Sequence, residues 1–95
     1  MNNNRILIKV GGAALVDDSV LETVTQAIQS YRRAGFKVAV VHGGGPAINA
    51  NLTKAGIKWN FVDGQRVTTP AMMDIIESTL CGEVNRKLVR YLSAA

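Results

Sequence analysis

Two glycine-rich stretches have the composition of an anion-binding site. Gly11-Gly12 follows the apolar run 5–10, and Gly43-Gly44-Gly45 follows the apolar run 36–42, with Pro46 directly after it. Glycine lets the backbone approach a ligand closely. A helix that begins after such a turn offers unpaired N–H groups and the positive end of its dipole. The pattern therefore predicts an anion site built from strand, glycine turn and helix.

Lys9 lies within the first apolar run, two residues before Gly11. An ammonium group is costly to bury, so two interpretations arise. Lys9 is either an edge-strand residue whose ammonium reaches solvent, or a cation that neutralises phosphate oxygens beside the glycine turn. The second glycine turn favours the phosphate role.

Arg66 and His42 are further candidates. Arg66 stands near the base of a predicted hairpin, where its guanidinium could bind a carboxylate in a bidentate manner. His42 has no cysteine or carboxylate at ligand spacing, so we expect no metal site. A hydrogen bond that fixes the glycine turn is favoured over a role for His42 as general base.

The glycine turns match neither common nucleotide fingerprint. A P-loop requires Gly-Lys-Ser/Thr, but Pro46 follows Gly45. The dinucleotide-binding pattern requires a third glycine or alanine where Ile48 stands. Both enzyme classes are therefore disfavoured.

The elements that would position these residues suggest an α/β fold. Runs 5–10 and 36–42 have the composition of strands buried on both faces of a parallel sheet. The segment 19–34 between them has helical periodicity, with Asp17 to Ser19 as capping residues and Gly35 as a stop. This βαβ unit brings both glycine turns to the carboxyl ends of neighbouring strands, where ligands bind in open sheets.

The second half of the chain predicts a short helix, a hairpin and a long helix. The short helix spans 46–55, with Pro46 in its first position. Segments 57–62 and 65–68 flank an Asp-Gly turn and form the hairpin. The long helix spans 70–92, with Gly82 in its middle, where close packing would explain a glycine.

Composition limits the classes of protein. The 95 residues suffice for one domain. The net charge of +4 is scattered, so we expect no nucleic-acid partner. No signal sequence or membrane span is recognisable, so we expect a cytoplasmic protein without a membrane partner. The single Cys81 lies in an apolar pattern and is expected to be a buried, inert thiol.

Four motifs together resemble the amino-acid kinase family. They are the segments 8–13 (IKVGGA), 41–46 (VHGGGP), 64–68 (GQRVT) and 82–87 (GEVNRK). The resemblance covers essentially the whole chain. It implies a three-layer α/β sandwich with a parallel sheet. Residues 1–95 would be the N-terminal portion of a single such domain, incomplete and ordered β-α-β-α-β-hairpin-α.

The resemblance also implies ATP-dependent phosphorylation of the side-chain carboxylate of N-acetyl-L-glutamate, with Mg²⁺ accompanying the nucleotide. By that resemblance, Lys9 stabilises the transferring phosphoryl group. Backbone N–H groups of Gly12 and Gly45 hold its oxygens, and Gly11 permits the turn. Positioning and charge stabilisation are the main demands of phosphoryl transfer.

The substrate side of the implied site involves three residues. Gly44 and Gly45 would contact the acetylated substrate, and Arg66 would bind its α-carboxylate. Other family members remain open, namely kinases of aminoadipate or glutamate and the kinase-like domain of acetylglutamate synthase. Lys9 argues for a kinase against the synthase. A module that only binds an acidic metabolite is a further alternative.

The resemblance carries two expectations about the chain as a whole. The later half of the family's domain has no counterpart here, so we expect the 95 residues alone not to turn over ATP. The helix 70–92 has apolar residues beyond one stripe, and the resemblance implies a homodimer through it. Burial within the domain is the alternative explanation for these residues: Met72, Met73, Ile75 and Ile76.

Overall fold

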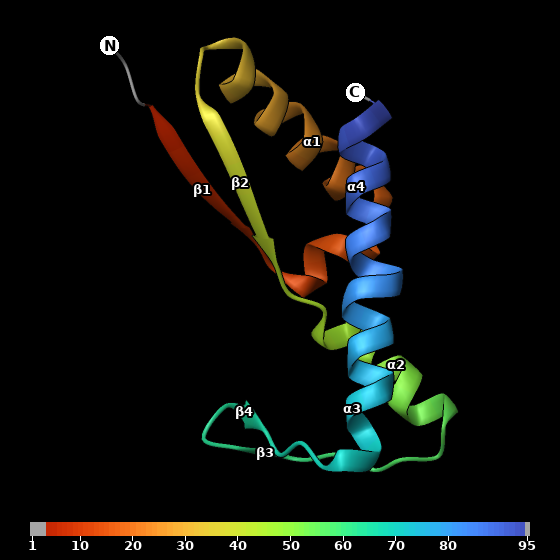
Figure 1. The fold of residues 1–95 in the computed structure, drawn as a ribbon. Coiled ribbons are helices and arrows are strands. Elements are labelled where there is room, and N and C mark those ends of the chain that lie inside the picture. The colour runs from red at the N-terminus through yellow and green to blue at the C-terminus, as the bar shows by residue number, and fades with distance from the viewer. Residues whose placement is uncertain (1–3, 95) are drawn as a thin grey trace.

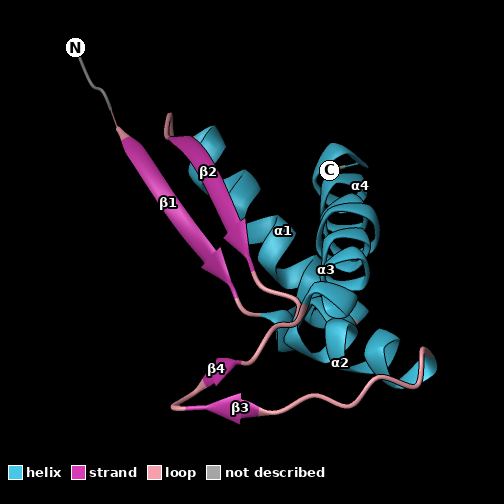
Figure 2. Cartoon of the chain, turned by 60° about the horizontal axis from the view of Figure 1, so that its bottom comes forward, coloured by secondary structure: helices cyan, strands magenta, loops and turns pink. Residues whose placement is uncertain are grey.

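The computed structural model describes residues 4–94. Strands β1 (Arg5–Val10) and β2 (Lys37–His42) pair in parallel, with Arg5 opposite Lys37 and Val10 opposite His42. Helix α1 (Asp18–Arg33) connects them, and both views show it on the same side of the sheet as the C-terminal helix (Figures 1 and 2). The predicted parallel βαβ unit is confirmed, with strand and helix ends within one residue of expectation.

The expectation that these strands are buried on both faces is wrong for the described residues. Side chains alternate along each strand, and only one set faces α1. On the other face Leu7 is 68% exposed and Val41 is 50% exposed. A mostly apolar composition is typical of strands covered on both faces, but among the described residues only the face toward α1 is covered.

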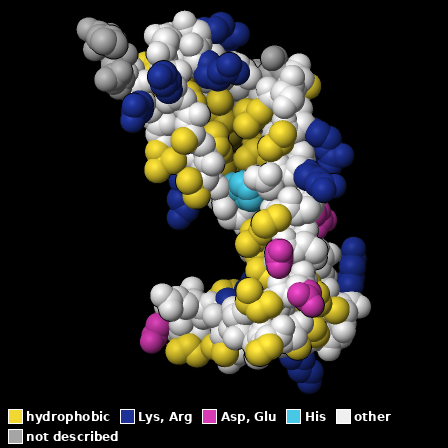
Figure 3. Space-filling model, in the orientation of Figure 1, with side chains coloured by type: hydrophobic (Ala, Val, Ile, Leu, Met, Phe, Trp, Pro, Cys, Tyr) yellow, Lys and Arg dark blue, Asp and Glu magenta, His cyan; other side chains and the backbone are white. Residues whose placement is uncertain are grey.

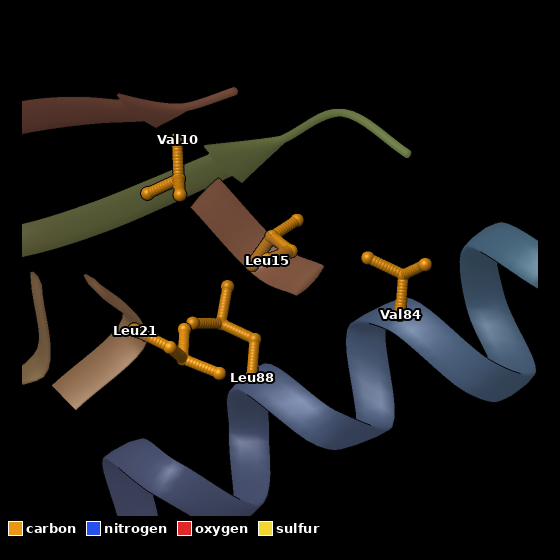
Figure 4. Close-up of a cluster of buried hydrophobic side chains, with 5 residues drawn as sticks. All are labelled: Val10, Leu15, Leu21, Val84 and Leu88. Carbon is orange, nitrogen blue, oxygen red and sulfur yellow. The ribbon is translucent and has the colours of Figure 1, made fainter. Parts of the chain in front are cut away.

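The main core joins the sheet to the helices. Val10 from β1 and Leu21 from α1 meet Leu88 from the C-terminal helix α4 (Asn85–Ala94), and Figure 4 shows these side chains pointing toward one another. Leu15 joins the cluster from η1 (Gly12–Val16), a 3₁₀ turn that the sequence did not predict. The first glycine turn is therefore fixed to the core directly behind it.

Asp17 caps α1, as the sequence predicted. Its carboxylate accepts hydrogen bonds from the N–H groups of Ser19 and Val20, at 3.0 and 3.4 Å. The Ser19 hydroxyl contributes most to lowering the pKa of Asp17 below the ordinary 3.8. Asp18 pairs with Lys87 of α4 at 2.8 Å, and that hydrogen bond is the main cause of its lowered pKa.

The lowered pKa values of Asp17 and Asp18 should make the stability of the folded chain sensitive to acid. A carboxyl whose pKa is lower in the folded chain stabilises it above the unfolded value of 3.8, and that contribution is lost as pH falls through the folded value. We therefore expect the free energy of unfolding, measured by urea titration, to fall as the pH is lowered below the unfolded value of 3.8. Asp18→Asn should be less stable at neutral pH and show a smaller acid loss. An acid loss unchanged in this variant would contradict the role of the Asp18–Lys87 pair.

Helix α2 (Gly45–Lys54) begins one residue earlier than predicted, so Pro46 takes the second helical position. The hairpin is confirmed but short, with β3 (Phe61–Val62) antiparallel to β4 (Gln65–Arg66). Asp63 and Gly64 both have positive φ, 50° and 78°, as a two-residue hairpin turn requires. The rest of segment 57–68 is loop.

The long C-terminal helix is continuous in space (Figure 1) but not uniform. It consists of α3 (Pro70–Glu77), the π-helical turn η2 (Ser78–Val84) and α4. A Cβ at Gly82 would meet nothing within 4 Å, so the expected close packing is absent at this residue. Cys81 is exposed, which corrects the expectation of a buried thiol. Both residues lie on the outer side of η2.

A second core lies under α3. Ile48 and Leu52 of α2 pack with Met72, and Ile75 and Ile76 lie partly buried against them. Burial within the domain therefore explains these three residues of the long helix, while Met73 remains 50% exposed.

Within residues 4–94, no helix combines the length and hydropathy that a membrane crossing requires.

Candidate anion-binding site

The two glycine turns touch each other. A Cβ placed on Gly12 would lie 2.8 Å from the nitrogen of Gly44 and 2.9 Å from that of Gly45. The Gly43 N–H donates to the carbonyl of Val10 at 3.0 Å, which extends the strand pairing into the second turn. The sequence predicted that these turns face one another, and the backbone contact confirms it.

Gly12 requires glycine because only backbone atoms surround the place of a Cβ, whereas a Cβ at Gly44 would have to displace a flexible side chain. At Gly44 the limiting neighbour is the Cδ2 atom of Leu80, 2.6 Å from a Cβ placed there. Gly11 differs, because its φ of −66° and ψ of 151° suit any residue and its Cβ would meet nothing within 4 Å. The expectation that Gly11 is needed to permit the turn is therefore wrong. A ligand passing close to Gly11 would be a separate reason for glycine.

The N-terminus of α2 opens at the contact between the turns. Gly44 is its N-cap residue and carries no side chain that could occupy the free N–H groups of the first turn. Gly45 begins the helix, and a Cβ there would meet nothing within 4 Å. These backbone N–H groups and the helix dipole give the junction a partial positive charge suited to an anion.

Lys9 lies on the exposed face of β1, opposite Val41 of β2. Among residues 4–94 its ammonium has neither an ion pair nor a side-chain hydrogen bond. It comes from the strand that leads into the first glycine turn. The geometry is compatible with both interpretations of Lys9, the solvated edge lysine and the phosphate ligand.

Arg66 is held against α2, the helix that begins at the junction. Its Nη2 donates to Oδ1 of Asn49 on α2 at 2.6 Å, and its Cζ lies 4.8 Å from the centre of the Phe61 ring. Asn49 is one helical turn after Gly45. The Nη1 atom is buried and has no hydrogen-bond partner among the described residues. An unpaired buried donor is costly, and a carboxylate at this point would satisfy it.

His42 forms two hydrogen bonds beside the glycine turn. Its Nδ1 lies 2.9 Å from the carbonyl oxygen of Gly43, and its Nε2 lies 3.0 Å from Nδ2 of Asn85. Both ring nitrogens are therefore engaged within the protein. This supports the predicted structural role of His42 over that of a general base.

A cavity of about 240 Å³ lies on the helical side of the turns. Gly12, Gly44 and Val84 contribute to its wall, but Lys9 and Arg66 do not. Its two charged side chains are already engaged, since Lys87 pairs with Asp18 and Glu83 accepts from Asn51. This cavity therefore shares Gly12 and Gly44 with the predicted site but does not include Lys9 or Arg66.

The elements that carry the predicted site residues lie on two sides of a notch in the molecule (Figures 1 and 3). In the space-filling view the outline is notched between the lower end of the parallel strands and the hairpin (Figure 3). The strands that precede both glycine turns end toward this notch from above, and β4, which carries Arg66, borders it from below (Figure 1). The notch therefore lies between the strands that lead into the glycine turns and the hairpin strand that carries Arg66.

Sequence reasoning missed the asparagines that support this arrangement. Asn49 orients Arg66, and Asn85 holds His42. Neither has a spacing signal of its own, because their partners lie 17 and 43 residues away. Asn85 does fall within the last of the four motifs.

Comparison with known proteins adds family evidence. A profile described as the amino acid kinase family matches residues 4–95. Acetylglutamate kinase from Clavibacter michiganensis subsp. michiganensis is 42% identical over 89 residues, which are 94% of this chain and 29% of that protein. Acetylglutamate kinase from Synechocystis sp. is 44% identical over 90 residues, 95% of this chain and 30% of that protein. The chain thus spans 29–30% of the length of these relatives.

Two solved structures are similar in fold. The protein smu.665 from Streptococcus mutans UA159 has a TM-score of 0.86 at 29% identity, covering 98% of this chain and 37% of that one. N-acetylglutamate synthase from Neisseria gonorrhoeae has a TM-score of 0.77 at 17% identity, covering 98% of this chain and 22% of that one. The second likeness concerns the fold alone.

Proposed function

Because this chain belongs to the amino acid kinase family, we propose that it forms one wall of the active site of an enzyme that phosphorylates the side-chain carboxylate of N-acetyl-L-glutamate with ATP. The observation that carries the proposal is the contact between Gly12 and the backbone nitrogens of Gly44 and Gly45. The names of the curated relatives support the choice of substrate. On this proposal residues 1–95 are the N-terminal portion of a single domain.

The glycine turns would carry the phosphoryl group. A carboxylate oxygen of the substrate attacks the γ-phosphorus, the bond to the β–γ bridging oxygen breaks, and ADP leaves. Backbone N–H groups of Gly12 and Gly45, with Lys9 nearby in sequence, would stabilise the negative charge on the transferring group. Gly11 would let the nucleotide phosphates approach the backbone. Mg²⁺ would arrive with those phosphates, as is usual for this ion.

Arg66 would bind the α-carboxylate of the substrate. Its guanidinium is oriented by Asn49 and Phe61, and its Nη1 lacks a partner. A carboxylate that accepts from Nη1 would supply the missing hydrogen bond and a compensating charge. Gly44 and Gly45 would contact the rest of the substrate between this carboxylate and the phosphoryl group.

Isothermal titration calorimetry of the 95-residue chain with N-acetyl-L-glutamate tests the proposal. We expect binding, and weaker binding of N-acetyl-L-glutamine, which keeps the α-carboxylate but lacks the side-chain charge. Glutamate and aminoadipate are the competing ligands to compare. If no acidic amino acid binds, the proposed substrate site is overturned.

We expect the 95 residues alone to form no acyl phosphate. The reason is that they correspond to only 29–30% of the length of the curated acetylglutamate kinases, so most of those enzymes has no counterpart in this chain. The measurement is trapping with hydroxylamine, which converts an acyl phosphate to a coloured hydroxamate. ATP-dependent hydroxamate above the enzyme-free background would contradict this expectation while still supporting the kinase assignment.

We also propose that the protein is a homodimer through the long helix. Met73 of α3 and Val89 of α4 are 50% and 49% exposed, and so remain available for an interface. Sedimentation equilibrium of the purified chain is the direct measurement, and a monomer at all concentrations tested would contradict the proposal.

A further inference from the structure

Asn85 is placed to select one tautomer of His42. The carbonyl oxygen of Gly43 can only accept, so the Nδ1 atom 2.9 Å away must carry the ring proton. In a neutral ring Nε2 is then an acceptor, and the Asn85 amide at 3.0 Å supplies the donor. The two contacts are mutually consistent only for the Nδ1–H form.

The His42 contact also orients a peptide that belongs to the candidate site. The carbonyl of Gly43 and the N–H of Gly44 are parts of the same planar peptide group. A bond that holds the Gly43 oxygen therefore fixes the direction in which the Gly44 N–H points. Gly44 itself is buried beneath Leu80 and Val84 of η2, which restrict it from the other side.

The π-helical turn places Asn85 for this task. Asn85 is the first residue of α4, directly after η2. Asn51 of α2 donates to Oγ1 of Thr79 and to Oε2 of Glu83, both at 2.8 Å, and so ties η2 to the helix that begins at the glycine turn. A π turn shifts the register of all following residues relative to an α-helix, and such turns occur often at functional sites.

We propose that Asn85 is a positioning residue that holds His42 in its Nδ1–H tautomer and thereby orients the Gly43–Gly44 peptide for ligand binding. Its action on the peptide does not depend on the ligand's identity. Only the consequence for N-acetyl-L-glutamate affinity rests on the proposed function. The role of Asn85 is thus testable in the free chain.

Nitrogen-15 NMR of the imidazole ring provides the test. In the parent chain we expect a protonated Nδ1 and an Nε2 that accepts a hydrogen bond. In Asn85→Ala the Nε2 signal should move toward that of a free acceptor, and the Gly44 amide signal should shift with it. Alanine favours helix, so α4 is expected to remain folded. Unchanged imidazole or Gly44 signals in this variant would overturn the proposal.

An isosteric variant separates hydrogen bonding from packing. Asn85→Asp has the same shape but can only accept, so we expect Nε2 to become protonated and its signal to change to the N–H type. A ring signal in Asn85→Asp identical to that of the parent chain would also overturn the proposal. Arg86→Ala, at the neighbouring exposed position, is the matched control and should leave both signals unchanged.

Ligand titration extends the test. We expect Asn85→Ala to weaken N-acetyl-L-glutamate binding by about 3- to 10-fold, the usual effect of one neutral hydrogen bond. Parent affinity in a variant with altered spectra would overturn the link to ligand binding. If the parent chain does not bind the ligand, the proposed function fails, and the spectra still decide the role of Asn85.

Discussion

Replacing Arg66 with alanine is expected to weaken N-acetyl-L-glutamate binding by at least about 30-fold, the equivalent of about 2 kcal/mol. The guanidinium is the one side chain near α2, among the described residues, that combines a full positive charge with a buried, unpartnered donor. Its loss removes a charge-assisted pair and leaves the substrate carboxylate desolvated without a partner. Calorimetry of the parent and variant chains measures the difference.

Two further variants show which property of Arg66 matters. Arg66→Lys retains the charge but loses the fork that reaches Asn49 and a carboxylate together, so we expect an intermediate loss. Arg32→Ala removes an exposed positive charge from the last turn of α1 and should leave affinity unchanged. If Arg32→Ala and Arg66→Ala weakened ligand binding equally, the loss would be explained by net charge alone, and a specific site at Arg66 would be contradicted.

Gly12→Ala is expected to have the largest effect on the site itself. The new Cβ would lie 2.8 and 2.9 Å from the nitrogens of Gly44 and Gly45 and 3.1 Å from the Cα of Gly44. These neighbours are backbone atoms, so no side chain can rotate away to relieve the overlap. We expect the free energy of unfolding to fall by about 1–3 kcal/mol, together with loss of ligand binding as the turns separate.

Gly11→Ala is the matched control for stability. It adds the same methyl group one residue earlier, where the backbone is extended and nothing lies within 4 Å. We expect stability to be unchanged or raised by up to about 1 kcal/mol, because alanine restricts the unfolded chain. Urea unfolding followed by circular dichroism compares the two variants. Equal destabilisation at both positions would contradict the contact between the turns.

The elements of the fold were largely predictable because their signals are local. The capping residue Asp17 and the stop at Gly35 define α1 within one residue. Asp63-Gly64 determines the hairpin turn through positive φ. The 3₁₀ turn and the π turn η2 were not predicted, because both depend on how the chain packs after the local signals are satisfied.

The residues proposed to contact the ligand were predictable from the sequence, but the residues that orient them were not. Lys9, the glycines and Arg66 stood out because their residue types are unusual where they occur. Asn49 and Asn85 did not, since polar residues on helices are ordinary and their partners are distant in sequence. The burial of Cys81 was wrongly expected for a related reason, since the π turn changes which residues of the long helix face outward.

Local sequence therefore determined which backbone segments form strands, turns and helices, and that each glycine turn follows a strand. Those properties depend on interactions within a few residues, such as caps, turn conformations and apolar periodicity. The folded chain was needed to show that Gly12 touches Gly44 and Gly45, that Gly11 is not required by the turn, and that Asn85 reaches His42. Such contacts join residues tens of positions apart. They arise from packing against the two cores, and no local pattern encodes them.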